Sequence, residues 1–226
     1  MKAGSIVGLV GPNGSGKTTL LHAAAGLLAV DEGSVVVAGA PAGSRSARRA
    51  TALVPDDPAG FDELSVAELI TLTHALWAAG PEAAARARLL TASFGLGGRL
   101  DQRLASLSRG LRRQASAVAA FSLAPPLVLV DEATATLDPE AVVVLGEAVV
   151  ALAARGCGVL LATQDLNFAD AVCHEIVLLH RGVAIDRGEP AALRLRHSAD
   201  SLEDVFLSAL GDGRLRERVR DAFVAL

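Results

Sequence analysis

The chain has 226 residues, of which 51% are hydrophobic and 3% aromatic, so it suits one large domain with a core of Ala, Val and Leu. A formal net charge of −4 provides no basic excess, which argues against nucleic acid as the main partner. Cys157 and Cys173 form no C-x-x-C motif and the five histidines have no metal-ligand spacing, so we interpret all of them as structural residues.

The first predicted elements are a strand, a glycine-rich loop and a helix. The apolar residues 5–10 are typical of a buried parallel strand, and residues 18–25 continue as a helix. The loop between them matches G-x-x-x-x-G-K-[ST], in which glycines let backbone N–H groups converge on an anion at a helix N-terminus. The predicted phosphate-binding residues of this P-loop are Gly11, Pro12, Asn13, Gly14, Ser15, Gly16, Lys17, Thr18 and Thr19.

A strand bounded by glycines is predicted over residues 35–37 and another over residues 51–54, after a short basic stretch. From Ser65 the pattern becomes helical, because Ser65 and Glu68 form an S-x-x-E capping box. A second helix opens at Pro81 and is broken by the glycines of residues 95–98. We place these helices in a helical lobe over about residues 60–124.

A further helix is predicted over residues 111–123, followed by a buried strand over residues 127–130. Two carboxylates, Asp131 and Glu132, come directly after this strand. Asp131 is expected to bind the Mg²⁺ held by the Thr18 hydroxyl, while Lys17 reaches the β- and γ-phosphates of a nucleotide. Glu132 is expected to face an attacking water, so metal and oriented nucleophile would meet at one strand end.

The rest of the chain continues the alternation of helices and strands. Asp138 is a plausible N-cap for a helix that runs to Arg155, and a buried strand follows over residues 158–162. Two short strands are predicted over residues 175–180 and 182–186, and a helical tail over about residues 189–226, with helices near Glu189, Ser201 and Gly213. Buried parallel strands with ligand loops at their C-terminal ends imply a doubly wound α/β domain.

The order of these motifs resembles the nucleotide-binding subunits of ABC transporters over essentially the whole chain. The D-loop of that family is matched by residues 135–138, including Asp138, and its Q-loop region by residues 54–66. Residues 201–207 are similar to a motif of exporters for drugs, lipids and polysaccharides. The family's LSGGQ signature falls at residues 107–111 and is matched by Leu107, Ser108 and Gly110, with Arg109 and Leu111 where a glycine and a glutamine are usual.

The resemblance implies a P-loop NTPase core, with a mostly parallel sheet flanked by helices and a helical lobe carrying the signature, in one domain over residues 1–226. It implies an ATPase that uses ATP and Mg²⁺ and sits in the cytoplasm, on the inner face of the membrane, through an integral-membrane permease. Two subunits would face each other, and Ser108 of one would contact the ATP held by the other. The alternatives are a regulatory subunit that hydrolyses little and a soluble ABC ATPase without a permease.

The sequence departs from the family at two further positions of the site. The Q-loop glutamine falls at Asp56, which is shorter and charged but still able to meet Mg²⁺. The switch histidine falls at Gln164, which can donate a hydrogen bond to the γ-phosphate but does not titrate near neutral pH. We therefore expect Asp56 and Gln164 to act with Glu132 in a slow ATPase.

Only ten residues precede Gly11, where the family has two strands and an aromatic residue that stacks on adenine. Loss of one such stack costs about 1–3 kcal/mol. We expect the natural start to lie upstream, because the strand at residues 35–37 would otherwise be an unpaired edge. No signal peptide is expected, and the longest apolar stretch, residues 141–154, is too short to span a bilayer.

Overall fold

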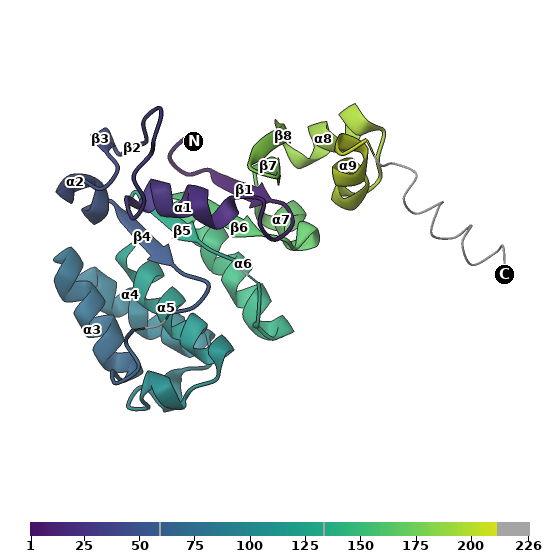
Figure 1. Ribbon diagram of the computed structural model, residues 1–226. Coiled ribbons are helices and arrows are strands. Elements are labelled where there is room, and N and C mark those ends of the chain that lie inside the picture. Colours follow the sequence, from purple (N-terminus) through teal and green to yellow (C-terminus); the bar gives the residue numbers. More distant parts are fainter. Residues whose placement is uncertain (59, 133, 212–226) are drawn as a thin grey trace.

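The structure is a computed structural model that describes residues 1–58, 60–132 and 134–211. Its centre is a six-stranded sheet in the order β4-β5-β6-β1-β7-β8 (Figure 1). Every neighbouring pair is parallel except β7 and β8, which pair antiparallel. The strands are β1 (Ile6–Val10), β4 (Thr51–Val54), β5 (Leu127–Val130), β6 (Gly158–Thr163), β7 (Glu175–His180) and β8 (Val183–Gly188). The predicted α/β fold with a mostly parallel sheet is confirmed.

Helices cover both faces of this sheet because alternate side chains of each buried strand point to opposite faces. On one face, α1 (Lys17–Ala25) packs through the buried Leu21 onto Leu9 and Leu129. On the other face, α6 (Pro139–Ala154) and α7 (Leu166–Val172) close the larger core, which contains Val128 and Val159. Each face of the sheet therefore has a core of its own.

The predicted helices of the lobe are present beside β4 (Figure 1). Helix α3 (Val66–Trp77) begins at a capping box in which Glu68 N donates to Ser65 Oγ and Ser65 N donates to Glu68 Oε2. Helices α3 and α4 (Pro81–Ser93) pack on α5 (Arg109–Leu123), with short 3₁₀ turns η1 (Gly97–Arg99) and η2 (Leu104–Ser106) between α4 and α5. Helix α5 starts two residues before the predicted position because Ser108 caps it.

Some elements differ from the expectation. The strand at residues 35–37 is not an unpaired edge, because β2 (Val36–Val37) pairs antiparallel with β3 (Ala40–Pro41) outside the main sheet. The tight turn between them uses positive φ angles at Ala38 and Gly39, the backbone of a type I′ hairpin. Helices α2 (Arg45–Arg49) and α7 were not predicted.

The tail contains α8 (Pro190–His197) and α9 (Leu202–Ala209), at the positions predicted near Glu189 and Ser201. The helix predicted near Gly213 lies outside the described residues. None of the helices within the three described segments has the length and apolar character needed to cross a membrane.

Candidate functional site

The P-loop connects the buried end of β1 to the first turn of α1. Gly16, at the N-cap of α1, has a φ of 100° and provides no side-chain cap, so N–H groups of the first helical turn can face an anion. The Lys17 side chain is only 4% exposed, and its Nζ donates to the carbonyl oxygens of Gly11 at 2.8 Å and Pro12 at 3.2 Å. The ammonium group is thus held inside the curl of the loop.

The P-loop packs directly against the end of β7 and the turn that follows it. A Cβ atom at Gly11 would lie 2.1 Å from the Leu179 carbonyl oxygen, so this position requires glycine. Gly182, in the turn between β7 and β8, donates its N–H to the Ser15 carbonyl oxygen at 3.1 Å. The Ser15 hydroxyl is buried and has no hydrogen-bond partner among the described residues. A phosphate oxygen would satisfy such a buried hydroxyl, so the loop fits a nucleotide.

The two carboxylates after β5 meet the P-loop from across the sheet. Thr18 Oγ1 donates to Asp131 Oδ1 at 3.1 Å, and Glu132 Oε1 lies 3.0 Å from Lys17 Nζ. Asp131 is 2% exposed, and the side chains of Lys17 and Glu132 are 4% and 15% exposed, so both pairs are largely shielded from solvent. The structure therefore brings together the four residues to which the sequence assigned phosphate, metal and water binding.

The donor set also fits Mg²⁺. A hydroxyl and a carboxylate oxygen, from Thr18 and Asp131, are hard ligands of the kind that this ion prefers. Within the described part of the chain, no group of three or more His, Cys, Asp or Glu side chains could hold a metal by itself. Magnesium sites with one or two protein ligands are common where substrate phosphates complete the coordination.

Asp56 has partners that the sequence did not suggest. Its Oδ2 accepts from Arg109 Nη2 at 2.9 Å and its Oδ1 accepts from Arg113 Nη1 at 3.1 Å. Among the described residues, neither Thr18 nor Asp131 has a side-chain hydrogen bond to Asp56. The assignment of Asp56 to Mg²⁺ stays a prediction.

Arg113 is a buried residue that sequence analysis missed. Its guanidinium donates to the carbonyl oxygens of Asp131, Glu132 and Ala135, in addition to the Asp56 carboxylate. Burial lowers the pKa of Arg113 and the Asp56 carboxylate opposes that shift; an arginine remains charged in either case.

The signature residues lie on the N-terminal end of α5, next to the loop after β5. Ser108 is exposed and its Oγ accepts from Leu111 N at 3.3 Å, while Leu107 is buried. A Cβ atom at Gly110 would lie 2.6 Å from the Thr136 carbonyl oxygen, so the helix touches that loop closely. Asp138 caps α6 by accepting from Ala141 N at 2.8 Å.

Gln164 follows the C-terminal end of β6, and its side chain is exposed. In the described segments, this side chain forms no hydrogen bond. Because β6 pairs in parallel with β1, Gln164 lies at the same edge of the sheet as the P-loop. The contact of Gln164 with the γ-phosphate stays a prediction.

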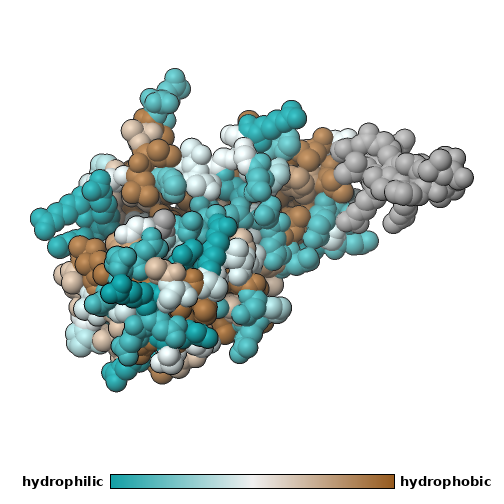
Figure 2. Space-filling model, turned by 60° about the horizontal axis from the view of Figure 1, so that its bottom comes forward, coloured by the Kyte–Doolittle hydropathy of each residue, from teal (hydrophilic) through white to brown (hydrophobic). Residues whose placement is uncertain are grey.

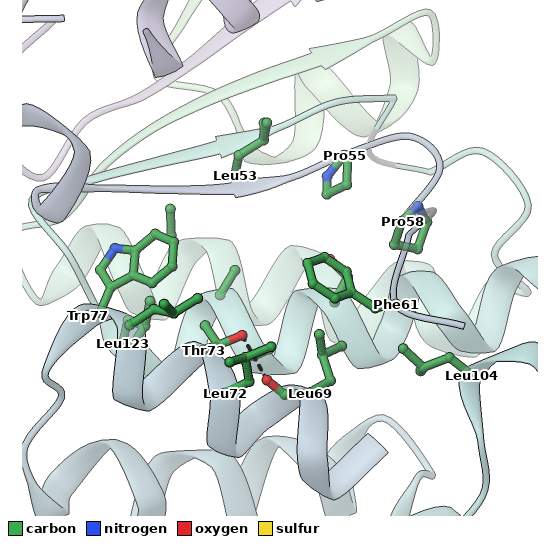
Figure 3. A pocket seen from close by; sticks show the side chains of 15 residues that line it. Leu53, Pro55, Pro58, Phe61, Leu69, Leu72, Thr73, Trp77, Leu104 and Leu123 are labelled. Atoms are coloured by element: carbon green, nitrogen blue, oxygen red, sulfur yellow. Dashed lines mark hydrogen bonds between the residues drawn. The ribbon is translucent and has the colours of Figure 1, made fainter. Parts of the chain in front are cut away.

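An apolar pocket of about 260 Å³ lies beside this site, between β4 and the helical lobe (Figure 3). Pro55, Pro58 and Phe61, from the loop that follows β4, face Leu69 and other side chains of α3 and α5. Asp56 belongs to the same loop, so the residue that contacts the arginines of α5 is a neighbour in sequence of residues that line the pocket.

Comparisons with known proteins agree with this geometry. Residues 1–135 match the ABC transporter family. The chain is 33% identical over 202 residues to the doxorubicin resistance ATP-binding protein DrrA of Mycobacterium tuberculosis, covering 88% of this chain and 60% of DrrA. It is 31% identical over 193 residues to the lipopolysaccharide export system ATP-binding protein LptB of Acidithiobacillus ferridurans, covering 83% of this chain and 80% of LptB.

Among solved structures, an ATP-binding subunit of an ABC transporter superposes with a TM-score of 0.87 at 30% sequence identity. That superposition covers 92% of this chain and 89% of the other. The chain spans only about 60% of the length of DrrA, whereas it covers most of LptB and of the solved subunit. The family match over more than half of the chain and the similarity to this solved subunit show that the chain belongs to the ABC transporter family.

Proposed function

We propose that this chain is the ATP-binding and ATP-hydrolysing subunit of an export system and powers a separate membrane permease. The observation that carries the proposal is the meeting of Lys17, Thr18, Asp131 and Glu132 at one edge of the sheet. The names of its relatives, which are ATP-binding proteins of drug resistance and lipopolysaccharide export, support the transport role.

The chemistry follows from what each side chain can hold. The P-loop N–H groups and Lys17 bind the β- and γ-phosphates, which requires Glu132 to leave the ammonium group that it contacts at 3.0 Å. Thr18 and Asp131 hold Mg²⁺, which spreads the phosphate charge when it is bound. Glu132, once released from Lys17, is free to accept a hydrogen bond from the attacking water and orient it toward the γ-phosphate.

The apolar pocket beside β4 is the surface that we assign to the permease. Its lining includes exposed apolar side chains, Phe61 at 44% and Leu76 at 61% exposure. Figure 2, in which the helical lobe comes forward, shows hydrophobic patches among hydrophilic residues on this face. A permease segment seated there would press on the loop that carries Asp56 and would hold the subunit at the inner face of the membrane. The signature assigns the second contact, across the ATP, to another copy or a homologous subunit.

The test is ATP binding and single-turnover hydrolysis by the purified chain with Mg²⁺. We expect Lys17→Ala to abolish measurable ATP binding in titration calorimetry, because Lys17 is the cation at the centre of the loop. We expect Glu132→Gln to bind ATP but hydrolyse it at least about a hundredfold more slowly, since a neutral amide cannot take up a proton from the attacking water as a carboxylate can.

Lys2→Ala is the matched control, because Lys2 is exposed and lies outside the site. Undiminished ATP affinity in Lys17→Ala would contradict the assignment of the P-loop. Binding without hydrolysis by the unaltered chain, alone and with its permease, would favour the regulatory alternative.

A further inference from the structure

Arg113 of α5 contacts two other segments of the site, the loop that carries Asp56 and residues 131–135 after β5. Its Nη1 donates to Asp56 Oδ1 at 3.1 Å and to the Ala135 carbonyl oxygen at 2.9 Å. Its Nη2 donates to the carbonyl oxygens of Asp131 and Glu132. The side chain is 2% exposed, so these acceptors rather than water satisfy the guanidinium.

The backbone that Arg113 holds is one that needs support. Glu132 has a φ of 46°, in the left-handed region of backbone conformation. A residue other than glycine adopts this conformation at a cost of about 1–3 kcal/mol. Such a conformation persists only where surrounding contacts impose it. A planar guanidinium with several fixed N–H donors suits this task, because it can hold two successive carbonyl oxygens together.

Asp56 completes the arrangement from the opposite side. Burial of a cation without a partner is costly, and the Asp56 carboxylate is the anion in contact with Arg113. Arg109 Nη2 donates a hydrogen bond to the second oxygen of that carboxylate at 2.9 Å. The two oxygens of Asp56 are therefore engaged by arginines of α5.

We propose that Arg113 is a positioning residue that fixes the backbone of Asp131 and Glu132, and that Asp56 holds Arg113 in place. This inference rests on the proposed ATP hydrolysis, because its consequence is the placement of the Glu132 carboxylate. The contacts of Arg113 are with the Asp56 carboxylate and with backbone carbonyl oxygens, so its effect on the reaction passes through the placement of the Asp131 and Glu132 side chains.

The test compares four single variants of the full chain and one double variant. Arg113→Met removes the guanidinium at similar length, and Arg113→Lys keeps the charge but loses the planar fork. Arg112→Met is the matched control, because Arg112 neighbours Arg113 on α5 and its Nε has no hydrogen-bond partner among the described residues. Glu132→Gln provides the background for a double-mutant cycle.

We expect Arg113→Met to slow single-turnover hydrolysis about a hundredfold, the cost of a misplaced reacting group. Its ATP dissociation constant should stay within about threefold of the unaltered chain. The hydrolysis rate of Arg113→Lys should lie between the rates of Arg113→Met and the unaltered chain. The rate of Arg112→Met should equal that of the unaltered chain. In the Glu132→Gln background, Arg113→Met should slow the reaction by less than about twofold, since it acts through the carboxylate already removed.

A second readout does not depend on hydrolysis. Hydrogen exchange of backbone amides in peptides that contain Asp131 and Glu132 should be faster in Arg113→Met than in Arg112→Met. Unchanged exchange, or an additive loss of rate in the cycle, would overturn the positioning role. If the unaltered chain binds ATP but does not hydrolyse it, the proposed function fails, and the exchange measurement alone decides the role of Arg113. If Arg113→Met does not fold, Arg113→Lys and Asp56→Asn take its place in both measurements.

Discussion

At the scale of single residues, Gly110 of the signature lies directly against the loop that follows β5. The nearest atom to a Cβ at this position is the Thr136 carbonyl oxygen, at 2.6 Å, and a backbone atom cannot rotate away as a side chain can. The contact fixes the N-terminal end of α5 against the loop that leads to Asp138.

We expect Gly110→Ala to lower the free energy of unfolding by about 1–3 kcal/mol through overpacking. Gly98→Ala is the control, since nothing lies within 4 Å of a Cβ there and its φ is not positive. Denaturant unfolding of both variants measures the difference. Equal stability of the two would contradict the close contact.

The candidate site shows which residues a sequence can reveal. Lys17, Thr18, Asp131 and Glu132 follow from the P-loop and from a carboxylate pair after a buried strand, because strand ends in a parallel sheet share an edge. Arg113 could not be predicted, because its acceptors lie up to 57 positions away and only folding brings them near. The partners of Asp56 were missed for the same reason.

At the scale of elements, a hydrogen-bonded cluster attaches the two tail helices to the edge of the sheet. Asp186, on β8, accepts from His197 Nε2 of α8 at 2.7 Å, and His197 Nδ1 lies 3.1 Å from Ser208 Oγ of α9. Arg196 of α8 pairs with the same carboxylate. Burial raises the pKa of Asp186, but hydrogen bonds from His197 and from Arg187 N, with the charge of Arg196, bring it below 3.8.

The lowered pKa determines the sign of a pH effect. A carboxyl group whose pKa is lower in the folded state stabilises the fold above its unfolded value and loses that effect as the pH falls through the folded value. We expect Asp186→Asn to be less stable than the unaltered chain at neutral pH. The difference should shrink as the pH falls below 3.8, the ordinary value of the group.

Denaturant unfolding at a series of pH values measures this difference. The control is Asp200→Asn, since Asp200 is exposed. A difference between Asp186→Asn and the unaltered chain that is independent of pH would contradict the role of the charge.

The elements that sequence analysis located are those with strong local signals: apolar runs for the strands, and Ser65, Pro81 and Asp138 at helix starts. Helix α2 has five residues and lies in a basic stretch without an apolar face, so no periodicity identified it. Helix α7, of seven residues, is similarly short. The pairing of β2 depended on a turn at Ala38 and Gly39 that was not recognised.

At the scale of the whole molecule, the proposed dimer divides each ATP site between two subunits. Lys17 lies in the P-loop, whereas Ser108 is exposed on the signature helix and is assigned to the nucleotide of the partner. Lys17→Ala and Ser108→Arg should each abolish hydrolysis in a homodimer. A mixed dimer of the two retains one complete site.

Equal mixing of the two inactive variants should restore about a quarter of the unaltered rate per subunit, because half of the dimers are mixed and each has one intact site of two. The restored rate is measured as phosphate release from the mixture, compared with phosphate release from each variant alone. Mixing Lys17→Ala with Glu132→Gln is the control, since both changes affect the same site of a subunit. A mixture as inactive as its components would contradict a shared site.

Sequence analysis located the strands of the main sheet but could not give their order within it. Parallel strands and intervening helices predict a doubly wound sheet, but they do not say that β1 lies between β6 and β7. That order results from the packing of α1, α6 and α7 on both faces, which no single segment determines.

The position of β1 has a consequence for how the protein is made. Its neighbours, β6 and β7, are among the later strands of the chain, and Gly182 beyond them contributes the hydrogen bond to Ser15. A ribosome releases the P-loop sequence before β6 and β7, so the partners that shape the loop leave the exit tunnel well after it. Until then the apolar β1 has no sheet in which to lie, and such exposed strands aggregate. The nascent chain therefore carries its phosphate-binding motif long before it can have a phosphate-binding loop.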